Sequence, residues 1–213
     1  MTGGETGVEP RRRTVRIGIT GPIGCGKSTV ARWLGERPGV VVIDADRVAR
    51  DVLAAGTPET AAVYARFGHE LRGADAELDR AALGRIVFGD PVALRDLEAI
   101  VHPAVRPRIV AEMEAADAAG AVAVVVEAIK LVEGGLAALC DEVWLVTCGP
   151  AVQLERLVGR GSSPDDARER IAAQGDLATR LRPAATHVID AGDEPEATRS
   201  RAIEQHEAAL ATS

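Results

Sequence analysis

Short runs of apolar, β-branched residues alternate along this chain with longer stretches of helical character. Five of the runs have the length of strands: Val15–Ile19, Val40–Ile43, Val122–Val126, Glu142–Val146 and His187–Ile189. Runs that are apolar at successive positions are typical of parallel strands buried on both faces. The pattern therefore predicts an α/β fold, in which helices cover both faces of a parallel five-stranded sheet.

The second and third predicted strands are separated by far more residues than a crossover needs. Residues 46–120 are mostly helical in pattern, divided by turn-forming residues at Gly56-Thr57-Pro58, Gly73 and Gly89-Asp90-Pro91. A helical crossover between parallel strands takes only about a dozen residues. The excess predicts a helical subdomain, about residues 57–119, inserted into the sheet domain.

Further helices are expected in the C-terminal part of the chain. Ser162-Ser163-Pro164-Asp165-Asp166 has the features of a helix start, with a hydroxyl cap, a first-turn proline and acids near the positive end of the helix dipole. We expect a helical lid at about residues 150–183 and a closing helix from about Glu194 to Leu210. The predicted organisation is a flexible leader, residues 1–13, followed by a single domain, residues 14–213. The core of that domain is expected at residues 14–56, 120–149 and 184–213.

Composition narrows the class of protein. Hydrophobic residues make up 46% of the 213 and charged residues 27%, which is ordinary for a soluble domain. The net charge of −7 argues against sequence-independent nucleic-acid binding, which needs a basic surface. The longest apolar run, Ala121 to Val126, is too short to span a membrane, and we find no signal peptide. These features predict a cytoplasmic protein without nucleic-acid or membrane partners. A monomer or a weak homo-oligomer is expected, and the sequence leaves the oligomeric state open.

A motif of specific chemistry follows the first predicted strand. Gly21-Pro22-Ile23-Gly24-Cys25-Gly26-Lys27-Ser28 fits G-x-x-x-x-G-K-[ST], the phosphate-binding loop of nucleoside-triphosphate enzymes. Only two of the 25 basic residues are lysines, and Lys27 supplies a compact ammonium where a planar guanidinium would crowd a phosphate. Loop N–H groups aimed at a helix N-terminus form an anion site. We interpret this segment as a nucleotide-binding loop, and the competing interpretation is a glycine-rich turn with an accidental lysine.

Acidic residues follow two of the predicted strands. Asp44 and Asp46 end the second strand, and Glu127 ends the third, so all three belong to the sheet edge where ligands bind in open parallel sheets. If Asp44 and Asp46 alternate as in a strand, only one of them faces the site. One acid there can act as a base in phosphoryl transfer, while Asp44 can equally cap a helix over Arg47–Leu53. Lys130 either meets an acceptor phosphate or pairs with Glu127 or Glu133 at the surface.

The predicted lid carries several arginines. Arg156 and Arg160 are four residues apart and share one helix face, where they can neutralise charge on a transferred phosphoryl group. For Arg168 and Arg170 we favour surface salt bridges. His102 precedes Pro103 in an expected turn, and it either contacts substrate or has a structural role.

Three cysteines, Cys25, Cys140 and Cys148, are odd in number and lack the spacing of metal ligands, which is typical of reduced thiols. Cys25 lies in the loop of N–H donors, which would favour its thiolate and make it sensitive to oxidation. The alternative is that Cys25 is a small residue that fills the loop.

From about residue 16 onward, the chain that carries these motifs resembles the dephospho-coenzyme A kinase family. Residues 19–31 look like its nucleotide loop, with Pro22 and Cys25 where Gly and Ser are usual, and residues 42–50 are very similar to its most diagnostic segment. Other matching segments are residues 78–80, 87–91 and 97–103 for the substrate-binding subdomain, and Gln153, Arg156, Arg160 and residues 170–174 for the lid.

The resemblance implies a P-loop kinase that uses ATP and Mg²⁺ to phosphorylate the ribose 3′-hydroxyl of dephospho-coenzyme A. It implies Asp46 as the base, Lys27, Arg156 and Arg160 as catalytic cations, and Ser28 as the magnesium ligand. The implied nucleotide contacts are Gly21, Ile23, Gly24, Cys25, Gly26, Lys27, Ser28 and Thr29. The implied acceptor contacts are Thr20, Asp44, Asp46, Arg50, His102, Arg106, Glu127 and Lys130.

The chain also departs from the family pattern. Glu127-Ala128-Ile129-Lys130-Leu131-Val132-Glu133 stands where the family has an acid followed by Val-Pro-Leu-Leu-Phe-Glu, and Ala185-Thr186 and Ala191 replace the usual Ala-Asp and Asn near the C-terminus. Two other functions stay open at this point. One is a different small-molecule P-loop kinase, for a nucleoside monophosphate or a metabolite hydroxyl, and the other is a nucleotide-dependent switch or binding module.

Overall fold

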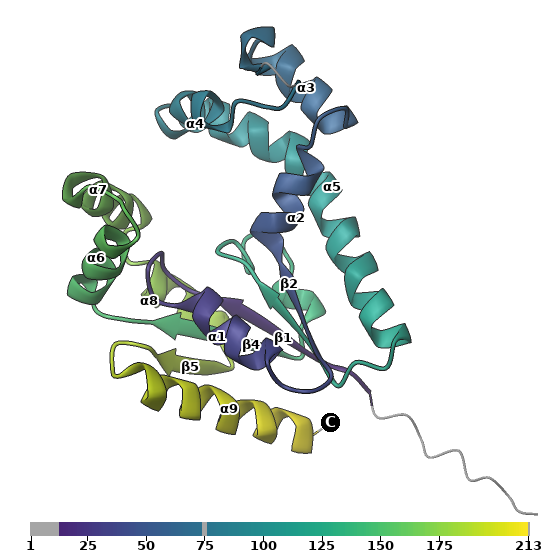
Figure 1. Ribbon diagram of the computed structural model, residues 1–213, viewed down its shortest axis with the longest axis vertical. Helices are drawn as coiled ribbons and strands as arrows, with labels where there is room; N and C mark the ends of the chain where they lie inside the picture. The colour runs from purple at the N-terminus through teal and green to yellow at the C-terminus, as the bar shows by residue number, and fades with distance from the viewer. Residues whose placement is uncertain (1–12, 74–75, 213) are drawn as a thin grey trace, which may run out of the picture.

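A five-stranded parallel sheet forms the base of the molecule (Figure 1). The computed structural model describes residues 13–73 and 76–212, so most of the expected leader lies outside the described part. The strand order is β2-β3-β1-β4-β5, and all neighbours pair in parallel. The strands are β1 (Val15–Thr20), β2 (Val40–Asp44), β3 (Ala123–Glu127), β4 (Glu142–Thr147) and β5 (His187–Asp190). All five predicted strands are confirmed, with ends shifted by one residue at most.

Helices cover both faces of this sheet. On one face lie α1 (Lys27–Gly35) and α9 (Pro195–Ala211), which bury alternate β1 residues Val15, Ile17 and Ile19. On the other face, the C-terminal half of α5 (Pro91–Ala118) packs on β2 and β3, and α8 (Leu177–Leu181) packs on β4. Because β3 is sandwiched between both layers, all four residues Ala123–Val126 are buried, as its unbroken apolar run predicted.

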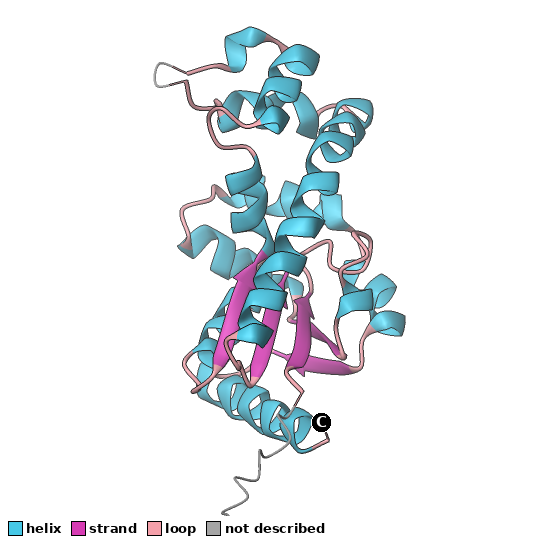
Figure 2. Ribbon diagram, turned by 90° about the vertical axis from the view of Figure 1, so that its right-hand side faces the viewer, coloured by secondary structure: helices cyan, strands magenta, loops and turns pink. Residues whose placement is uncertain are grey.

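The insert between β2 and β3 is helical and extends away from the sheet (Figures 1 and 2). Its helices are α2 (Ala45–Val52), α3 (Pro58–Phe67), the 3₁₀ turn η1 (His69–Leu71), α4 (Arg80–Phe88) and the long α5. The N-terminal part of α5 packs with α3 and α4 around a hydrophobic cluster of their own, which includes Val63, Leu83 and Val101. Since α5 also packs on the sheet, this one helix joins both hydrophobic cores.

Helix α5 corrects one expectation. The predicted turn at Pro103 is absent, because Pro103 and Pro107 both lie inside the continuous helix. A proline in a helix removes a hydrogen bond to the carbonyl four residues earlier. Both prolines are exposed, so the carbonyl groups left without that bond lie on the side of the helix that faces water.

The segment after β4 is helical as well. It contains α6 (Pro150–Gly159), α7 (Pro164–Gln174), α8 and the 3₁₀ turn η3 (Arg182–Ala184), while η2 (Ala137–Leu139) precedes β4. The predicted helix start is confirmed, because Ser163 caps α7 by accepting a hydrogen bond from the N–H group of Asp166. Within the part of the chain that the structure describes, no helix has both the length and the apolar character needed to cross a membrane.

Candidate active site

The loop between β1 and α1 has the backbone conformation of a phosphate-binding loop. Gly21, Gly24 and Gly26 have φ angles of 143°, 77° and 95°, a region that residues with a side chain rarely adopt. A Cβ atom on Gly21 would also lie 2.1 Å from the carbonyl oxygen of Val146. Glycine is therefore required at position 21 both for its conformation and for its close contact with β4.

This loop leads directly into the N-terminus of α1. The N-cap residue is Gly26, which offers no side-chain cap to the first-turn N–H groups of the helix. Those N–H groups and the positive end of the helix dipole are directed to the mouth of the loop. The arrangement is an anion site suited to a polyphosphate.

Lys27 lies inside the loop, where its Nζ donates a 3.1 Å hydrogen bond to the carbonyl of Pro22. Its side chain is buried, with 7% of the residue exposed. Burial lowers the pKa of Lys27, while the charges of Glu127 and Asp46 act in the opposite direction. The ammonium group is thus held among carboxylates beside the anion site.

Ser28 and Glu127 meet at the end of β3. The Ser28 hydroxyl donates to Oε1 of Glu127 at 2.6 Å. Burial raises the pKa of Glu127, although the bond from Ser28 and the charge of Lys27 counteract this. Glu127 is also the β-sheet partner of Asp44, so the acids predicted at this edge do lie together.

The two aspartates after β2 have different positions. Asp44 ends the strand and caps α2, because its Oδ1 accepts from the N–H groups of Asp46 and Arg47 at 2.8 and 3.1 Å. Its other oxygen pairs with Arg50 at 3.6 Å. Asp46 is not in the strand, as alternation would require, but in the first turn of α2, where it is exposed. The carboxylate of Asp46 is therefore the freer of the two.

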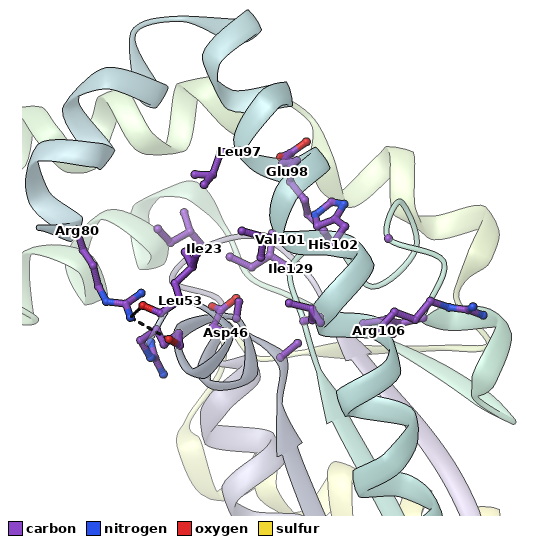
Figure 3. A pocket seen from close by; sticks show the side chains of 18 of the residues that line it. Ile23, Asp46, Leu53, Arg80, Leu97, Glu98, Val101, His102, Arg106 and Ile129 are labelled. Carbon is purple, nitrogen blue, oxygen red and sulfur yellow. Dashed lines mark hydrogen bonds and ion pairs between the residues drawn. The ribbon is translucent and has the colours of Figure 1, made fainter. Parts of the chain in front are cut away.

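A cavity of about 700 Å³ opens beside Asp46 (Figure 3). Ile23 of the loop, α2, α5, the segment after β3 and α7 all border it. In Figure 3, Asp46 and Leu53 face Leu97, Val101 and His102 of α5 across the cavity. The candidate residues that line it are Ile23, Asp46, Arg50, His102, Arg106 and Lys130.

Three candidates lie elsewhere or differ from expectation. Thr20 is fully buried, and its hydroxyl donates to the carbonyl of Ile129 at 3.0 Å, so it supports the segment after β3. Lys130 pairs with Glu98 of α5, so both partners expected for it, Glu127 and Glu133, were wrong. Arg106 lines the cavity but extends away from Asp46 in Figure 3.

Two arginines of the predicted lid, Arg156 and Arg160, both lie near the phosphate-binding loop but in different surroundings. Arg156 donates a 2.7 Å hydrogen bond to the backbone carbonyl of Ala191, and its guanidinium lies beside Gly26. Because this bond uses the main chain, it does not depend on the departure at position 191. Arg160 follows the last residue of α6, and its charge lowers the pKa of Lys27, which indicates proximity to the loop.

Sequence reasoning named several lid residues without predicting their contacts. Arg168 does pair with Asp165 at 2.8 Å, but Arg170, for which a salt bridge was favoured, lines the cavity. Gln153 and Gln174 hold Ile23 by its carbonyl and its N–H group, at 2.8 Å each. Their place in the lid motif was visible in the sequence, but nothing in it indicated these partners.

Cys25 corrects a further expectation. It is fully buried, and its pKa is raised by its hydrogen bond to Cys148 and by burial, so the loop does not favour its thiolate. The pKa of Cys148 is lowered instead, first by the hydrogen bond with Cys25. The thiol that ionises more readily is thus the one outside the predicted motif.

Comparison with known proteins shows the family to which this chain belongs. The family model for dephospho-CoA kinase matches residues 15–196. A dephospho-CoA kinase of Synechococcus sp. is 47% identical over 191 residues, which cover 89% of this chain and 90% of the relative. A dephospho-CoA kinase of Streptomyces avermitilis is 51% identical over 168 residues, which cover 78% of this chain and 80% of the relative.

Solved structures agree with the fold. A crystal structure from Thermus thermophilus has a TM-score of 0.77 and 32% identity, and the match covers 92% of this chain and 98% of that one. A dephospho-CoA kinase from Campylobacter jejuni has a TM-score of 0.61 and 24% identity, over 92% and 97% of the two chains. A shikimate kinase from Bacteroides thetaiotaomicron, with a TM-score of 0.53 and 18% identity over 91% and 98%, shares the fold alone.

Proposed function

We propose how this chain, which belongs to the dephospho-CoA kinase family, carries out the reaction of that family with the residues described above. The enzyme transfers the terminal phosphoryl group of ATP to the ribose 3′-hydroxyl of dephospho-coenzyme A. The products are coenzyme A and ADP, and this is the last step of coenzyme A biosynthesis. One observation carries the assignment of roles: Ile23 of the phosphate loop and Asp46 line the same cavity.

ATP would bind with its β- and γ-phosphates in the loop from Gly21 to Thr29. The open N–H groups at the start of α1 and the ammonium of Lys27 support this role. Phosphoryl transfer asks little covalent chemistry of the protein, since positioning and charge stabilisation lower the barrier. Arg156 and Arg160, which lie near the loop, would neutralise charge that develops on the transferred group.

Mg²⁺ fits the donor set beside the loop. The Ser28 hydroxyl supplies an oxygen ligand, which Mg²⁺ prefers, and the Glu127 carboxylate accepts a hydrogen bond from that hydroxyl. The described residues hold no group of three or more acidic, cysteine or histidine side chains that would bind a metal without substrate. We therefore assign Ser28 as a direct ligand and Glu127 as a carboxylate that orients it. When bound, the metal neutralises charge on the phosphate oxygens of ATP.

Asp46 is the residue we assign as the base. Its carboxylate is exposed to the cavity, whereas Asp44 is occupied by the cap of α2. A positioned carboxylate orients the 3′-hydroxyl and accepts its proton as the new P–O bond forms. The negative charge of Asp46 acts to raise the pKa of Lys27, which supports placing the base and the phosphate-binding ammonium in one site.

The acceptor would occupy the cavity beyond Asp46. Dephospho-coenzyme A carries a diphosphate and a long uncharged arm, and the lining offers both kinds of surface. Cations around the cavity suit the diphosphate, and they are Arg50, Arg80, Arg106, Lys130 and Arg170. Apolar side chains suit the arm, and they include Leu53, Phe88, Leu97 and Val101. His102, also in the lining, is assigned to the acceptor as a polar contact.

This assignment extends to the two helical segments and to the cellular setting. We propose that residues 57–119 form the acceptor-binding subdomain and that residues 150–183 form a lid over both substrates. The acidic net charge supports a protein without nucleic-acid partners. The free thiols of Cys25, Cys140 and Cys148 support a reducing compartment such as the cytoplasm. A monomer or a weak homo-oligomer fits a site built within one chain.

The test of these roles compares two neighbouring aspartates. We expect Asp46→Asn to lower kcat by about 100-fold or more, because it removes the base, with little change in the KM for ATP. Asp44→Asn is the matched control, since asparagine caps helices as well as aspartate does, and it should keep kcat near that of the wild type. Full turnover in Asp46→Asn together with a loss in Asp44→Asn would move the base to Asp44.

The two other functions predict different kinetics. Another small-molecule kinase would not prefer dephospho-coenzyme A over a panel of nucleoside monophosphates and metabolite hydroxyls. A nucleotide switch would hydrolyse ATP at a rate independent of any acceptor. Rates of ADP release with and without each acceptor therefore separate the three possibilities.

A further inference from the structure

Two thiols outside the transfer chemistry lie in contact beside the nucleotide loop. The sulfur atoms of Cys25 and Cys148 are 2.7 Å apart. Cys25 belongs to the loop after β1, and Cys148 directly follows β4, so the chain brings together residues 123 positions apart. A disulfide places its sulfur atoms about 2.05 Å apart, so only a small further approach separates these thiols from a bond.

The packing of the loop on β4 fixes this contact. Gly21 lies against the carbonyl of Val146, and Gly24 lies against the backbone of Gln153 at the start of α6. The Cys25 sulfur is 3.8 Å from the carbonyl oxygen of Cys148, and the Cys148 sulfur is 3.9 Å from that of Gly24. The two side chains are thus enclosed between backbone segments that leave each sulfur facing the other.

The two thiols differ in access and in acidity. Cys25 is fully buried, whereas Cys148 is half-buried and can meet a small reagent. The hydrogen bond with Cys25 and the positive charges of Arg156 and Lys27 lower the pKa of Cys148, against the opposing effects of burial and of Asp190. An accessible thiolate next to a second, protected thiol is the arrangement of a redox-sensitive pair.

We propose that Cys25 and Cys148 form a reversible disulfide that weakens the binding of ATP. The oxidant is a hydroperoxide. The Cys148 thiolate attacks one peroxide oxygen, the O–O bond breaks, and hydroxide or alkoxide leaves and takes up a proton, which gives a sulfenic acid on Cys148. The Cys25 sulfur then attacks the Cys148 sulfur, the S–O bond breaks, and the Cys25 proton leaves with the hydroxyl as water. Two thiols lose two electrons, and the peroxide gains them.

The disulfide acts on the loop through its geometry. Cys25 stands between Gly24 and Gly26, two residues held at positive φ, in the middle of the N–H groups assigned to the phosphates. A bond to Cys148 ties that point to the end of β4 and draws the neighbouring N–H groups out of position. This effect on ATP rests on the proposed role of the loop, whereas the formation of the disulfide does not.

The first test identifies the bond by mass spectrometry of the full chain after treatment with hydrogen peroxide. Trypsin leaves Cys140 and Cys148 in one peptide, residues 131–156, so the Cys140→Ser variant is used. We expect the intact protein to lose two hydrogen atoms and peptide 17–27 to be joined to peptide 131–156, and dithiothreitol to reverse both. In Cys25→Ser, Cys148 should stop at a sulfenic acid that dimedone traps. Oxidised Cys140→Ser in which peptides 17–27 and 131–156 stay separate overturns the proposal.

The second test measures the affinity of a fluorescent ATP analogue before oxidation, after oxidation and after reduction. We expect a loss of about tenfold to 100-fold that dithiothreitol restores, the scale set by losing one hydrogen bond to a charged phosphate. The Cys148→Ser variant should keep its own affinity through the same treatment, while Cys140→Ser should respond as the wild type does. A confirmed cross-link with unchanged affinity also overturns the proposal, and it would point to an error in the role of the loop.

Discussion

At the scale of single residues, the site depends on a buried lysine that is surrounded by opposite charge. Burial lowers the pKa of Lys27, and Glu127 and Asp46 act to keep it charged. The ammonium is fixed by the carbonyl of Pro22, so it needs no rearrangement when a phosphate binds. We expect Lys27→Ala to lower kcat by about 100-fold or more while the protein stays folded, as measured by steady-state kinetics and thermal unfolding.

The chain supplies its own control for that substitution. Lys130, the second of its two lysines, lines the cavity and pairs with Glu98 of α5. Lys130→Ala should leave the KM for ATP unchanged and raise only the KM for the acceptor. Equal losses of kcat in both variants would contradict a specific role for Lys27.

Residue types predicted the positions of these residues better than they predicted their partners. The sequence motif located Lys27 and Ser28 in the loop, and the apolar strands located Asp44 and Glu127 at the sheet edge, because such spacing follows from the backbone, whereas Asp46 lies in the first turn of α2. The sequence did not show that Lys130 would pair with Glu98, since these residues come from different elements and meet only after folding. The expectation that Cys25 is the thiol that ionises most readily was wrong for the same reason. Its pKa depends on contact with Cys148, which is 123 positions away in the sequence.

At the scale of elements, the contact between the loop and β4 places the nucleotide site on the sheet. Gly21 has a φ of 143°, and a Cβ there would lie 2.1 Å from the carbonyl oxygen of Val146. We expect Gly21→Ala to destabilise the protein by about 3 kcal/mol, because backbone strain and overlap act together. Chemical denaturation measures this loss.

The control for Gly21→Ala is a glycine in α6, the helix that follows β4. Gly159 lies in α6, and a Cβ there would meet nothing within 4 Å. Gly159→Ala should be neutral or slightly stabilising, since alanine favours helix. A loss at Gly159 as large as at Gly21 would mean that the fold is sensitive to any added methyl group.

Helix α9 contains a buried histidine that makes the stability of the fold depend on pH. His206 is 2% exposed, and neither ring nitrogen has a hydrogen-bond partner among the described residues. Burial, with a further effect of Arg37, lowers its pKa in the fold. As the pH falls below about 6.5, the unfolded chain takes up a proton that the folded chain resists, so stability is lost from that pH downward.

The corresponding prediction concerns His206→Leu. We expect the variant to lose less stability than the wild type between pH 7 and pH 5, and to gain at pH 7 from the removal of two unpaired polar atoms. Denaturant titrations at several pH values measure both effects. His69→Ala, at an exposed position of η1, should follow the wild-type curve. Parallel curves for His206→Leu and the wild type would assign the acid response to other groups.

Elements themselves were largely predictable from the sequence. All five strands follow from apolar runs, and the start of α7 follows from Ser163 and Pro164, because strands and caps depend on local residue types. The continuous helix of α5 was not predictable from the sequence, since Pro103 would end an isolated helix. Because α5 packs against two hydrophobic cores, it stays helical past Pro103. The local sequence pattern does not show this packing.

At the scale of the whole molecule, an acidic protein must bind two polyanions. The net charge is −7, yet arginines from α2, α4, α5 and α7 surround one cavity together with Lys130. The attraction is therefore local, because at physiological salt charges farther apart than about 8 Å are largely screened. The sequence shows the net charge, but only the fold shows which arginines are brought to the cavity.

Two arginines on α7 test whether that cleft binds the acceptor. Arg170 lines the cavity, while Arg168, two residues earlier on the same helix, pairs with Asp165. We expect Arg170→Ala to raise the KM for dephospho-coenzyme A by about tenfold, the effect of losing about 1.4 kcal/mol of binding, with kcat little changed. Arg168→Ala should change neither constant by more than about twofold, because an exposed pair contributes little.

The dependence on salt separates a charge contact from a packing effect. If Arg170 attracts the acceptor by its charge, the KM of the wild type rises with ionic strength, and the KM of Arg170→Ala rises less steeply, since one of the screened contacts is gone. Steady-state measurements at several KCl concentrations give the two slopes. Identical slopes with a raised KM would mean that Arg170 shapes the cavity without attracting the acceptor, and that the lid contributes to acceptor binding by enclosure alone.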